Sequence, residues 1–432
     1  MYKEINIGLI GLGVIGGQVA KVLQEKAGDL SLQAGTPIKL RKIKVLPSDL
    51  EKPLVRQFPE ELFTTNDDDF FNDNSIKIII ELIGGERPAY DYITRALQGG
   101  KHVVTANKEV IAKHGLKLRA LAHEHGASLY YEASVGGGIP LIAPLETDLR
   151  ANYIKSIYAI INGTTNYILT RMSKDGIEFE RALADAQKLG YAEANPKNDI
   201  EGIDAAYKIA IMATLAFQSE VRPEEVYNKG ISKLDSRDFR YAGELGYEIK
   251  LLAIAKQYDN AIEARVHPAF IHKDSVLAGV NGVFNAVSIE GDLVGQVVFT
   301  GQGAGPLATS SAVISDVLRA AGNYTLGTST SAIKINAAKV VQPIANIITR
   351  YYLRLSILDS TGVLASIARV LGAHKISIAS VIQKETDTLS QTAEIVIMTH
   401  PAAGRAVDAA ISELSMLQVV KEINNVIRVE EQ

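Results

Sequence analysis

Residues 5–16 read Ile-Asn-Ile-Gly-Leu-Ile-Gly-Leu-Gly-Val-Ile-Gly, and this stretch decides the fold. The apolar run over 5–10 predicts a short buried strand, and the pattern after it predicts a helix from Val14 to Gln24. A strand that ends in glycines spaced Gly-x-Gly-x-x-Gly and opens a helix is typical of a dinucleotide-binding turn. A purely structural glycine turn is the alternative.

Each glycine has a separate task in a dinucleotide-binding turn. Gly11 permits the tight bend, and Gly13 lets backbone N–H groups approach a pyrophosphate. Gly16 lets the helix pack against the strand, with the phosphate at the positive end of the helix. The sequence therefore predicts cofactor contacts at Gly11, Gly13, Val14, Ile15 and Gly16.

Further strand-like runs follow at 38–46, 76–83 and 102–105, separated by segments of helical period. Strands that alternate with helices predict an α/β fold with a doubly wound parallel sheet of the Rossmann type. We place this dinucleotide-binding domain at residues 1–135.

The end of the second predicted strand should distinguish NAD from NADP. An acidic residue there would bind a ribose 2′-hydroxyl, and an arginine or lysine would bind a 2′-phosphate. The strand leads to Leu46-Pro47-Ser48-Asp49, where Asp49 stands away from the usual spacing. Arg41, Lys42 and Lys44 lie within the strand, and we interpret them as a solvated face. The predicted cofactor is NADP or NAD, with the choice open.

The middle of the chain, residues 136–320, combines glycine-rich turns with a helix pattern near 201–217. It predicts an α+β domain, for which we expect roles in substrate binding, catalysis and dimerisation. Its strand patterns lie near 154–161, 263–271 and 283–299. Residues 321–349 contain Pro343 and are expected to form a linker or return segment.

The last segment, residues 350–432, starts a new pattern in the order βαββαβ, which predicts a ferredoxin-like module. Its strands are expected at 351–358, 376–384, 393–399 and 419–429, and its helices at 363–374 and 405–414.

Composition limits the function classes. The chain has 432 residues, 47% hydrophobic and 22% charged, which predicts two or three globular domains. The formal charge of −4, without a long basic run, argues against nucleic-acid binding. No apolar stretch reaches the roughly 20 residues of a membrane span, and Met1-Tyr2-Lys3-Glu4 lacks the zones of a signal peptide. The absence of cysteine excludes disulfides, thiolate zinc sites and thiol nucleophiles, and a cytoplasmic location is expected.

Three turns are candidates for ligand contacts. Thr105-Ala106-Asn107-Lys108 follows a strand at the carboxyl edge of the sheet, where Lys108 either touches cofactor or substrate or is a surface lysine. Gly136-Gly137-Gly138-Ile139-Pro140 predicts a hinge or a nest of backbone groups. Asn162-Gly163-Thr164-Thr165-Asn166 offers donors for a carboxylate, or forms an ordinary turn.

Charged residues gather in the stretch 186–208, which places Glu193, Asp199, Asp204 and Lys208 around a loop that leads into a helix. Asp204 and Lys208 are four residues apart and share one helix face. An exposed ion pair is one interpretation, but the following turns are strongly apolar and predict a largely buried helix. A buried ion pair is costly, and this indicates a function.

Chemistry suggests what that function is. Hydride delivered to an aldehyde carbon leaves negative charge on oxygen, and a lysine ammonium group can stabilise and protonate it. Nearby carboxylates can bind the α-ammonium group of a substrate. The residues therefore suit a substrate that is both an amino acid and an aldehyde or alcohol.

With these motifs the chain resembles the homoserine dehydrogenase family over nearly its whole length. The stretches that carry the resemblance are GLGVIG at 11–16, TANK at 105–108, EASVGGGIP at 132–140, NGTTNYIL at 162–169 and the full signature at 186–208. The resemblance implies interconversion of L-aspartate 4-semialdehyde and L-homoserine with a nicotinamide cofactor, by a homodimer or homotetramer.

The resemblance also implies roles for single residues. It implies that Lys208 is the proton donor and that Lys108 is a second lysine that meets both nicotinamide and substrate. The implied substrate contacts are Glu193, Asp199, Asp204, Thr164 and Gly163. The implied cofactor contacts include Thr105. They also include Gly303, which lies in a loop at 301–305 that closes over the cofactor. Backbone carbonyls of a structural monovalent-cation site, usually sodium, are implied at Glu132, Val135, Gly137 and Ile139.

The C-terminal module resembles an ACT domain through Asp359-Ser360-Thr361-Gly362-Val363-Leu364 at its first strand–helix turn. The implied ligand is L-threonine, acting as a feedback inhibitor, and a module that only packs or dimerises is the alternative. A catalytically silent amino-acid sensor is the other function considered for the whole chain, although a sensor would not need both lysines and the acidic cluster. The dehydrogenase that forms aspartate semialdehyde from the acyl phosphate is excluded, because it needs a cysteine nucleophile.

Overall fold

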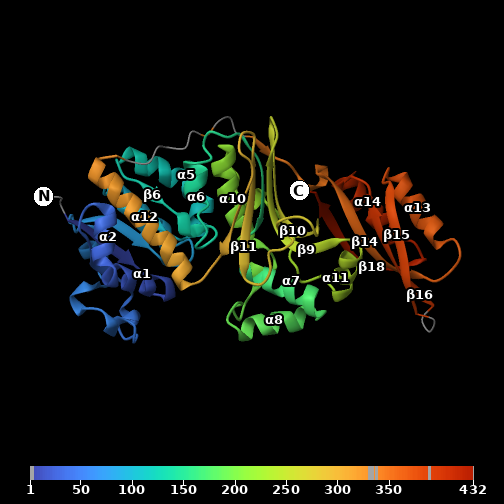
Figure 1. Ribbon diagram of the computed structural model, residues 1–432, viewed down its shortest axis with the longest axis horizontal. Helices are drawn as coiled ribbons and strands as arrows, with labels where there is room; N and C mark the ends of the chain where they lie inside the picture. Colours follow the sequence, from blue (N-terminus) through green and yellow to red (C-terminus); the bar gives the residue numbers. More distant parts are fainter. Residues whose placement is uncertain (1–3, 329–334, 336–338, 388–390, 432) are drawn as a thin grey trace. The chain divides into compact units, whose positions relative to one another are not determined.

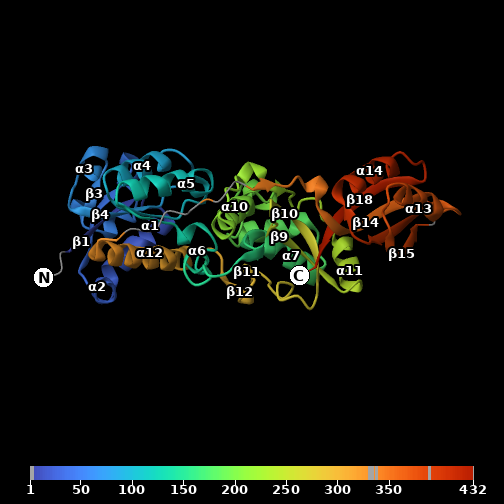
Figure 2. The same ribbon diagram turned by 90° about the horizontal axis from the view of Figure 1, so that it is seen from above.

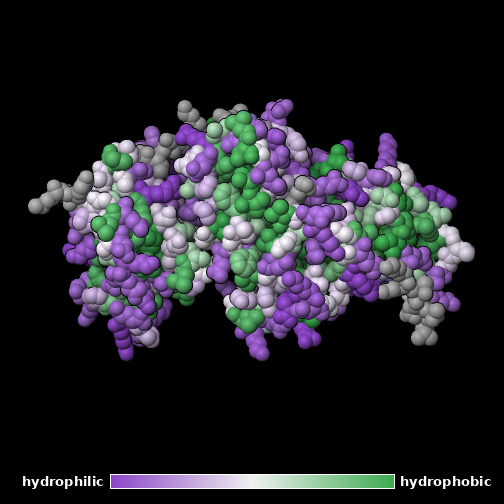
Figure 3. Space-filling view, viewed as in Figure 1, coloured by the Kyte–Doolittle hydropathy of each residue, from purple (hydrophilic) through white to green (hydrophobic). Residues whose placement is uncertain are grey.

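The computed structural model (Figure 1) describes residues 4–328, 335, 339–387 and 391–431, without the side chains of 384–387. The chain forms two compact units. The first consists of Met1–Ile154, Ala210–Pro223 and Glu290–Ala338, and the second of Lys155–Ile209, Glu224–Ile289 and Lys339–Gln432. The face shown in Figure 3 mixes hydrophilic and hydrophobic residues. Among the described residues, none of the helices has both the length and the apolar character needed to cross a membrane.

The first unit is built on a parallel sheet with the strand order β3-β2-β1-β4-β5-β6. This is the doubly wound order of dinucleotide-binding domains, and the order reverses beside β1. The strands are β1 (Ile5–Ile10), β2 (Ile38–Lys44), β3 (Phe63–Thr64), β4 (Ile76–Glu81), β5 (His102–Thr105) and β6 (Leu129–Tyr130). The predicted fold class of this part is therefore confirmed.

Helices accompany this sheet, and the first two and the last of them share one apolar core with its strands. They are α1 (Val14–Glu25), α2 (Ala27–Ala34), α3 (Asp67–Phe71), α4 (Ala89–Gln98), α5 (Lys108–Glu124), α6 (Ile142–Glu146) and α12 (Pro306–Leu326). α12 comes from far along the chain and lies beside α1 in both ribbon views (Figures 1 and 2). Its Val313 and Val317 are buried in one core with Ile7 and Val19.

The position of α12 differs from the sequence prediction in two respects. The segment from 306 was expected in the middle domain, and 321–349 was expected to be a linker. The helix continues to Leu326, and its apolar stripe packs in the first unit because residues three and four apart share one face. Residues 329–334 and 336–338 of the expected linker lie outside the described residues. The boundaries at 135, 320 and 350 stay predictions.

The second unit contains a mixed sheet whose neighbouring strands follow the order β11-β7-β9-β10-β18-β14-β16-β15. Its strands are β7 (Ile154–Ile160), β9 (Tyr247–Gln257), β10 (Ala261–His272), β11 (Phe284–Gly291), β14 (Ile348–Leu358), β15 (Ile378–Asp387), β16 (Thr392–Thr399) and β18 (Val420–Glu430). Its helices are α7 (Gly163–Asp175), α8 (Phe179–Lys188), α9 (Lys197–Ile200), the start of α10 (Ile203–Phe217), α11 (Ser236–Glu244), α13 (Val363–Ala373) and α14 (Gly404–Leu414). The expected strand pattern at 283–299 is in fact two strands, β11 and β12 (Gly295–Gln302).

The C-terminal part of this unit has the predicted order βαββαβ, from β14 to β18. One face of its strands packs on α13 and α14 through an apolar core that includes Leu353, Leu355 and Ile367. On β14, residues of the opposite face alternate with these, and Tyr352 stacks on Phe270 of β10 with ring centroids 4.5 Å apart.

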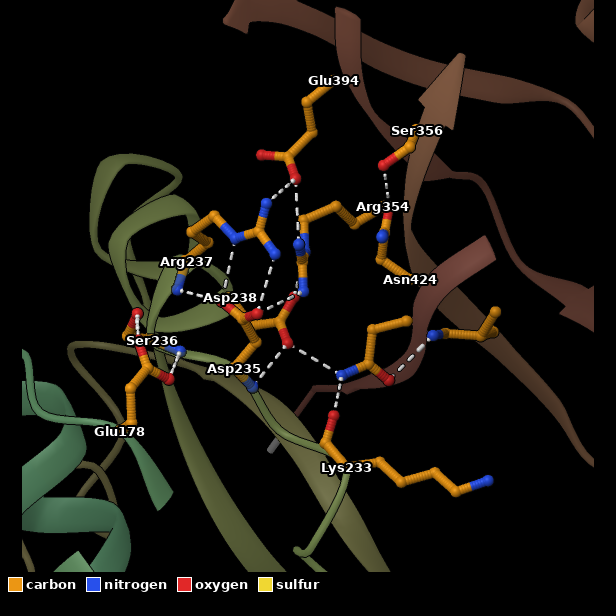
Figure 4. Close-up of polar contacts among 12 residues, drawn as sticks. Glu178, Lys233, Asp235, Ser236, Arg237, Asp238, Arg354, Ser356, Glu394 and Asn424 are labelled. Atoms are coloured by element: carbon orange, nitrogen blue, oxygen red, sulfur yellow. Dashed lines mark hydrogen bonds and ion pairs between the residues drawn. The ribbon is translucent and has the colours of Figure 1, made fainter. Parts of the chain in front are cut away.

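A buried charge cluster joins this opposite face to α11 (Figure 4). Arg354 on β14 is 1% exposed, and its Nε donates to Asp238 of α11 at 2.7 Å. Its Nη1 donates to Glu394 of β16 at 2.9 Å. Arg237, half-exposed on α11, also donates to Glu394, at 3.2 Å. The cluster therefore links the C-terminal module to a helix from the middle of the chain.

Candidate active site

The glycine-rich turn after β1 has the geometry that a bound dinucleotide needs. Gly11 has φ +91°, a conformation that favours glycine. A methyl group added at Gly16 would overlap the carbonyl oxygen of Gly11, so only glycine lets α1 pack this closely on the strand. A methyl group added at Gly13 would meet no protein atom within 4 Å, and this leaves open space at the first turn of α1. The residues present therefore fit a pyrophosphate there.

Substitutions at Gly13 and Gly16 should have different effects. We expect Gly16→Ala to lower the free energy of unfolding by about 1–3 kcal/mol or more, because the methyl group overlaps backbone. Gly13→Ala should leave stability unchanged but weaken cofactor binding about tenfold or more, because its methyl group occupies space meant for the phosphates. Thermal unfolding and cofactor titration by fluorescence measure both effects. Equal effects of the two variants on stability and affinity would contradict the assignment.

The loop after β4 contacts the glycine-rich turn. A methyl group at Gly11 would lie 2.7 Å from Cγ2 of Ile83 and 3.1 Å from the carbonyl oxygen of Leu82. The turns after β1 and β4 are thus in contact where the strand order reverses, which is the place where doubly wound sheets bind ligands. Thr105 ends β5, and the half-buried Lys108 is the first residue of α5. Both predicted residues therefore lie at the carboxyl edge of this sheet.

Of the three basic residues of β2 that were expected to form a solvated face, Arg41 is exposed, but Lys42 and Lys44 are not. Lys44 is 5% exposed, and its Nζ lies 2.5 Å from Asp67 at the start of α3. Lys42 lies 2.7 Å from Asp69 of the same helix. The interpretation failed because the partners of these lysines follow more than 20 residues later in the sequence.

Asp49, the acid after β2, is also engaged locally. Its carboxylate accepts a hydrogen bond from the Leu46 N–H at 3.2 Å and pairs with Lys52 at 2.5 Å. The hydrogen bond from Lys52 lowers the pKa of Asp49. The choice between NAD and NADP therefore stays open.

The glycine loop at 136–138 packs against the predicted closing loop. Gly136 and Gly137 have φ +73° and +56°, as expected for a hinge or nest. A methyl group at Gly137 would lie 2.5 Å from the carbonyl oxygen of Gly303, so two predicted site segments meet here. The Glu132 carboxylate accepts backbone N–H groups at the start of α6, at 2.6 Å from Leu141 and 2.7 Å from Ala143.

The charged stretch forms a compact network in the second unit. The Asn162 side chain donates to Asp199 at 2.7 Å and to Asp204 at 2.9 Å. Lys208 Nζ lies 2.8 Å from Asp204 and donates to the carbonyl of Ile161 at 2.8 Å. The side chains of Lys208 and Asp204 are only 11% and 4% exposed, as expected for a buried pair. The structure thus brings together three of the predicted residues.

Asn162 is a residue whose role the sequence analysis missed. Its side chain accepts from the Thr165 N–H at 2.9 Å and caps α7, so the expected turn is the start of a helix. The signal was present in the sequence, because asparagine before Gly-Thr-Thr at the end of a strand is a helix N-cap pattern. One residue therefore both starts α7 and holds two carboxylates.

The other predicted substrate residues lie near this network with other neighbours. Thr164 donates to the carbonyl of Tyr191 at 2.5 Å. A methyl group at Gly163 would lie 2.9 Å from the carbonyl oxygen of Val283, so this glycine is needed for packing. Glu193 is exposed, and its carbonyl accepts from Gln187 at 3.2 Å. The structure therefore does not join Glu193 to Asp199 and Asp204 through the described contacts.

Comparison with known proteins agrees with this geometry. The family model for homoserine dehydrogenase matches residues 140–318, its NAD-binding domain matches 11–132, and the ACT domain matches 351–415. A homoserine dehydrogenase from Synechocystis sp. is 42% identical, over 98% of this chain and 99% of its own length. The chain belongs to the homoserine dehydrogenase family.

Solved structures of homoserine dehydrogenases agree with the fold. The enzyme from Thiobacillus denitrificans has a TM-score of 0.93 at 40% identity and covers 100% of this chain and 99% of its own. A hyperthermophilic archaeal homoserine dehydrogenase in complex with NADPH has a TM-score of 0.63 at 27% identity and covers 74% of this chain and 98% of its own. The predicted family, fold class and NAD(P)-dependent oxidoreductase activity are thus confirmed, and the alternative of a silent sensor is set aside.

Proposed function

We propose that Lys208 is the proton donor of this homoserine dehydrogenase and that Asp204 holds it in place. The observation that carries the proposal is the buried contact of 2.8 Å between the two side chains. Hydride added to C4 of aspartate semialdehyde leaves negative charge on the oxygen, and an ammonium group there stabilises and protonates it. The carbonyl of Ile161 fixes Nζ from a second side.

Carboxylates next to this lysine suit the α-ammonium group of the substrate. We assign this contact to Asp199 and Asp204, with Glu193 as a further candidate on the exposed loop. The backbone N–H groups of Gly163 and Thr164, in the first turn of α7, suit the substrate carboxylate because a helix N-terminus favours an anion. These contacts would select an amino acid among alcohols of similar size.

The substrate assignment predicts a specific change of selectivity. Asp199→Asn keeps an oxygen that accepts the Asn162 hydrogen bond but removes the charge. We expect the KM for L-homoserine to rise about ten- to hundredfold, the effect of losing a charge-assisted hydrogen bond. Activity with 4-hydroxybutanoate, which lacks the ammonium group, should not change. Initial rates with both alcohols test this, and equal losses for both would refute the ammonium contact.

The nicotinamide cofactor supplies or accepts the hydride. We propose that Gly11, Gly13, Val14, Ile15 and Gly16 hold its pyrophosphate, and that Thr105, Lys108 and Gly303 contact it further along. The open space at Gly13 supports this placement. The cofactor is NAD or NADP.

We assign a structural monovalent cation, usually sodium, to the backbone carbonyls of Glu132, Val135, Gly137 and Ile139. The carbonyl of Glu132 already accepts the Val135 N–H at 3.3 Å, and a carbonyl oxygen has a second lone pair for an ion. The left-handed backbone at Gly137 supports a sharp bend in this loop, as a ring of carbonyls around one ion needs.

We propose that the ACT module binds L-threonine at Asp359-Ser360-Thr361-Gly362 and that this binding inhibits the enzyme. Gly362 has φ +87° and is the N-cap of α13, so the turn that carries the motif is tight.

We further propose assembly as a homodimer or homotetramer. Exposed apolar side chains of this module, Leu364 at 43% and Met416 at 76%, support an interface.

A further inference from the structure

Glu81 is a buried carboxyl group that the roles above do not use. It is the last residue of β4, it is 0% exposed, and it lies at the carboxyl edge of the parallel sheet. One of its oxygens accepts the Ile83 N–H at 2.7 Å, and the other accepts the Thr105 hydroxyl at 2.5 Å. A buried carboxyl is costly without such partners. Burial raises its pKa to about 7, against the opposing effect of these hydrogen bonds.

The hydrogen bonds continue from Thr105 to the start of α5. The Thr105 hydroxyl accepts the Asn107 N–H at 3.0 Å. The Asn107 side chain donates to the carbonyls of Ile83 at 3.2 Å and Gly85 at 2.7 Å, and it caps α5 at Val110 at 3.1 Å. The hydrogen bonds thus form a closed ring through Glu81, Ile83, Asn107 and Thr105. It ties the ends of β4 and β5 to the loop 82–85 and to the helix turn that begins with Lys108.

The loop in this network also contacts the glycine turn that is proposed to hold the cofactor. Ile83 and Leu82 lie against Gly11, the first glycine of the nucleotide turn. A shift of loop 82–85 would therefore change both that turn and the position of Lys108. Reactions that depend on two bound partners are sensitive to such shifts, and a displacement of about 1 Å can cost about a hundredfold in rate.

We propose that Glu81 is a positioning residue for hydride transfer: through Thr105 and Asn107 it sets the place of loop 82–85 and Lys108. The inference rests on the proposed placement of cofactor and Lys108 at this edge. Glu81 acts through its hydrogen bonds and does not touch the reacting atoms.

The experiment compares variants in the full-length enzyme. Glu81→Met removes both acceptors at similar volume, whereas Glu81→Gln keeps an acceptor for the Ile83 N–H. Thr105→Val removes the bridging hydroxyl, and Thr105→Ser restores it. We expect Glu81→Met and Thr105→Val to lower kcat about 10- to 100-fold with a much smaller change in the KM for homoserine, and the Gln and Ser variants to recover most of it.

The matched control is Lys101→Met. Lys101 is 5% exposed and donates to the carbonyls of Asp73 at 2.7 Å and Ile76 at 3.0 Å, at the opposite, amino end of β4. The substitution Lys101→Met should lower thermal stability but leave kcat unchanged. If Lys101→Met lowers kcat as much as Glu81→Met at the same loss of stability, the positioning role is overturned.

One further variant separates this inference from the proposed function. Lys108→Ala should also lower kcat. A loss of kcat in Lys108→Ala, together with full activity in Glu81→Met and Thr105→Val, would reject the role of Glu81 but not that of Lys108. Full activity in Lys108→Ala would reject the assignment of Lys108 and this inference with it.

Discussion

Replacing Lys208 by alanine is expected to lower kcat about 10²- to 10⁴-fold, the usual contribution of a general acid. The physical reason is the loss of the ammonium group that Asp204 and the Ile161 carbonyl hold in place. Cofactor affinity should stay unchanged, because Lys208 is not among the residues assigned to the cofactor. Steady-state rates and cofactor titration measure the two quantities.

A lysine outside the network provides the control for this substitution. Lys188 is exposed at the end of α8, and Lys188→Ala should keep normal turnover. Removing Lys208 leaves the buried Asp204 with its hydrogen bond from Asn162 but without its cation, so some loss of stability is expected, and circular dichroism must show that Lys208→Ala is folded at the assay temperature. Near-normal turnover of a folded Lys208→Ala would contradict the proposed proton donor.

Replacing Arg354 by methionine is expected to destabilise the second unit by about 3–5 kcal/mol, the cost of breaking a buried ion pair from one side. The variant leaves Asp238 and Glu394 at 0% and 7% side-chain exposure without this cation. Asp238 would keep hydrogen bonds from Tyr352 at 3.0 Å and Asn425 at 2.8 Å, which cannot supply the missing charge. Urea unfolding followed by circular dichroism gives the free energy.

Arg237 is the matched control for Arg354, because it contacts the same Glu394 from a side chain that is 43% exposed. Arg237→Met should cost about 0–1 kcal/mol, as for surface ion pairs. Similar losses for both arginines would show that burial does not decide the strength of this cluster.

Much of the first unit could be predicted from sequence because its signals are local. The apolar run at 5–10, the three glycines and the alternation of strands and helices all act over a few residues. The packing of α12 in the same core could not be predicted. Its apolar stripe shows that one face is buried, but not which sheet covers it.

The candidate site likewise has one part that local sequence patterns predict and another that they do not. The pair Asp204 and Lys208 follows from helix spacing, and the structure brings them within 2.8 Å. The link from Asn162 to both carboxylates spans about 40 residues, and no local pattern contains it. Glu81 was missed for the same reason, because its partner Thr105 lies on the next strand and only the sheet brings them together.

This chain should oxidise L-homoserine with a nicotinamide cofactor. The most direct test follows absorbance at 340 nm with purified protein, L-homoserine and either NAD or NADP, with and without L-threonine. We expect reduction of one of the cofactors that depends on homoserine, and a slower rate with threonine. No homoserine-dependent signal with either cofactor, together with no oxidation of NADH or NADPH by aspartate semialdehyde, would contradict the account.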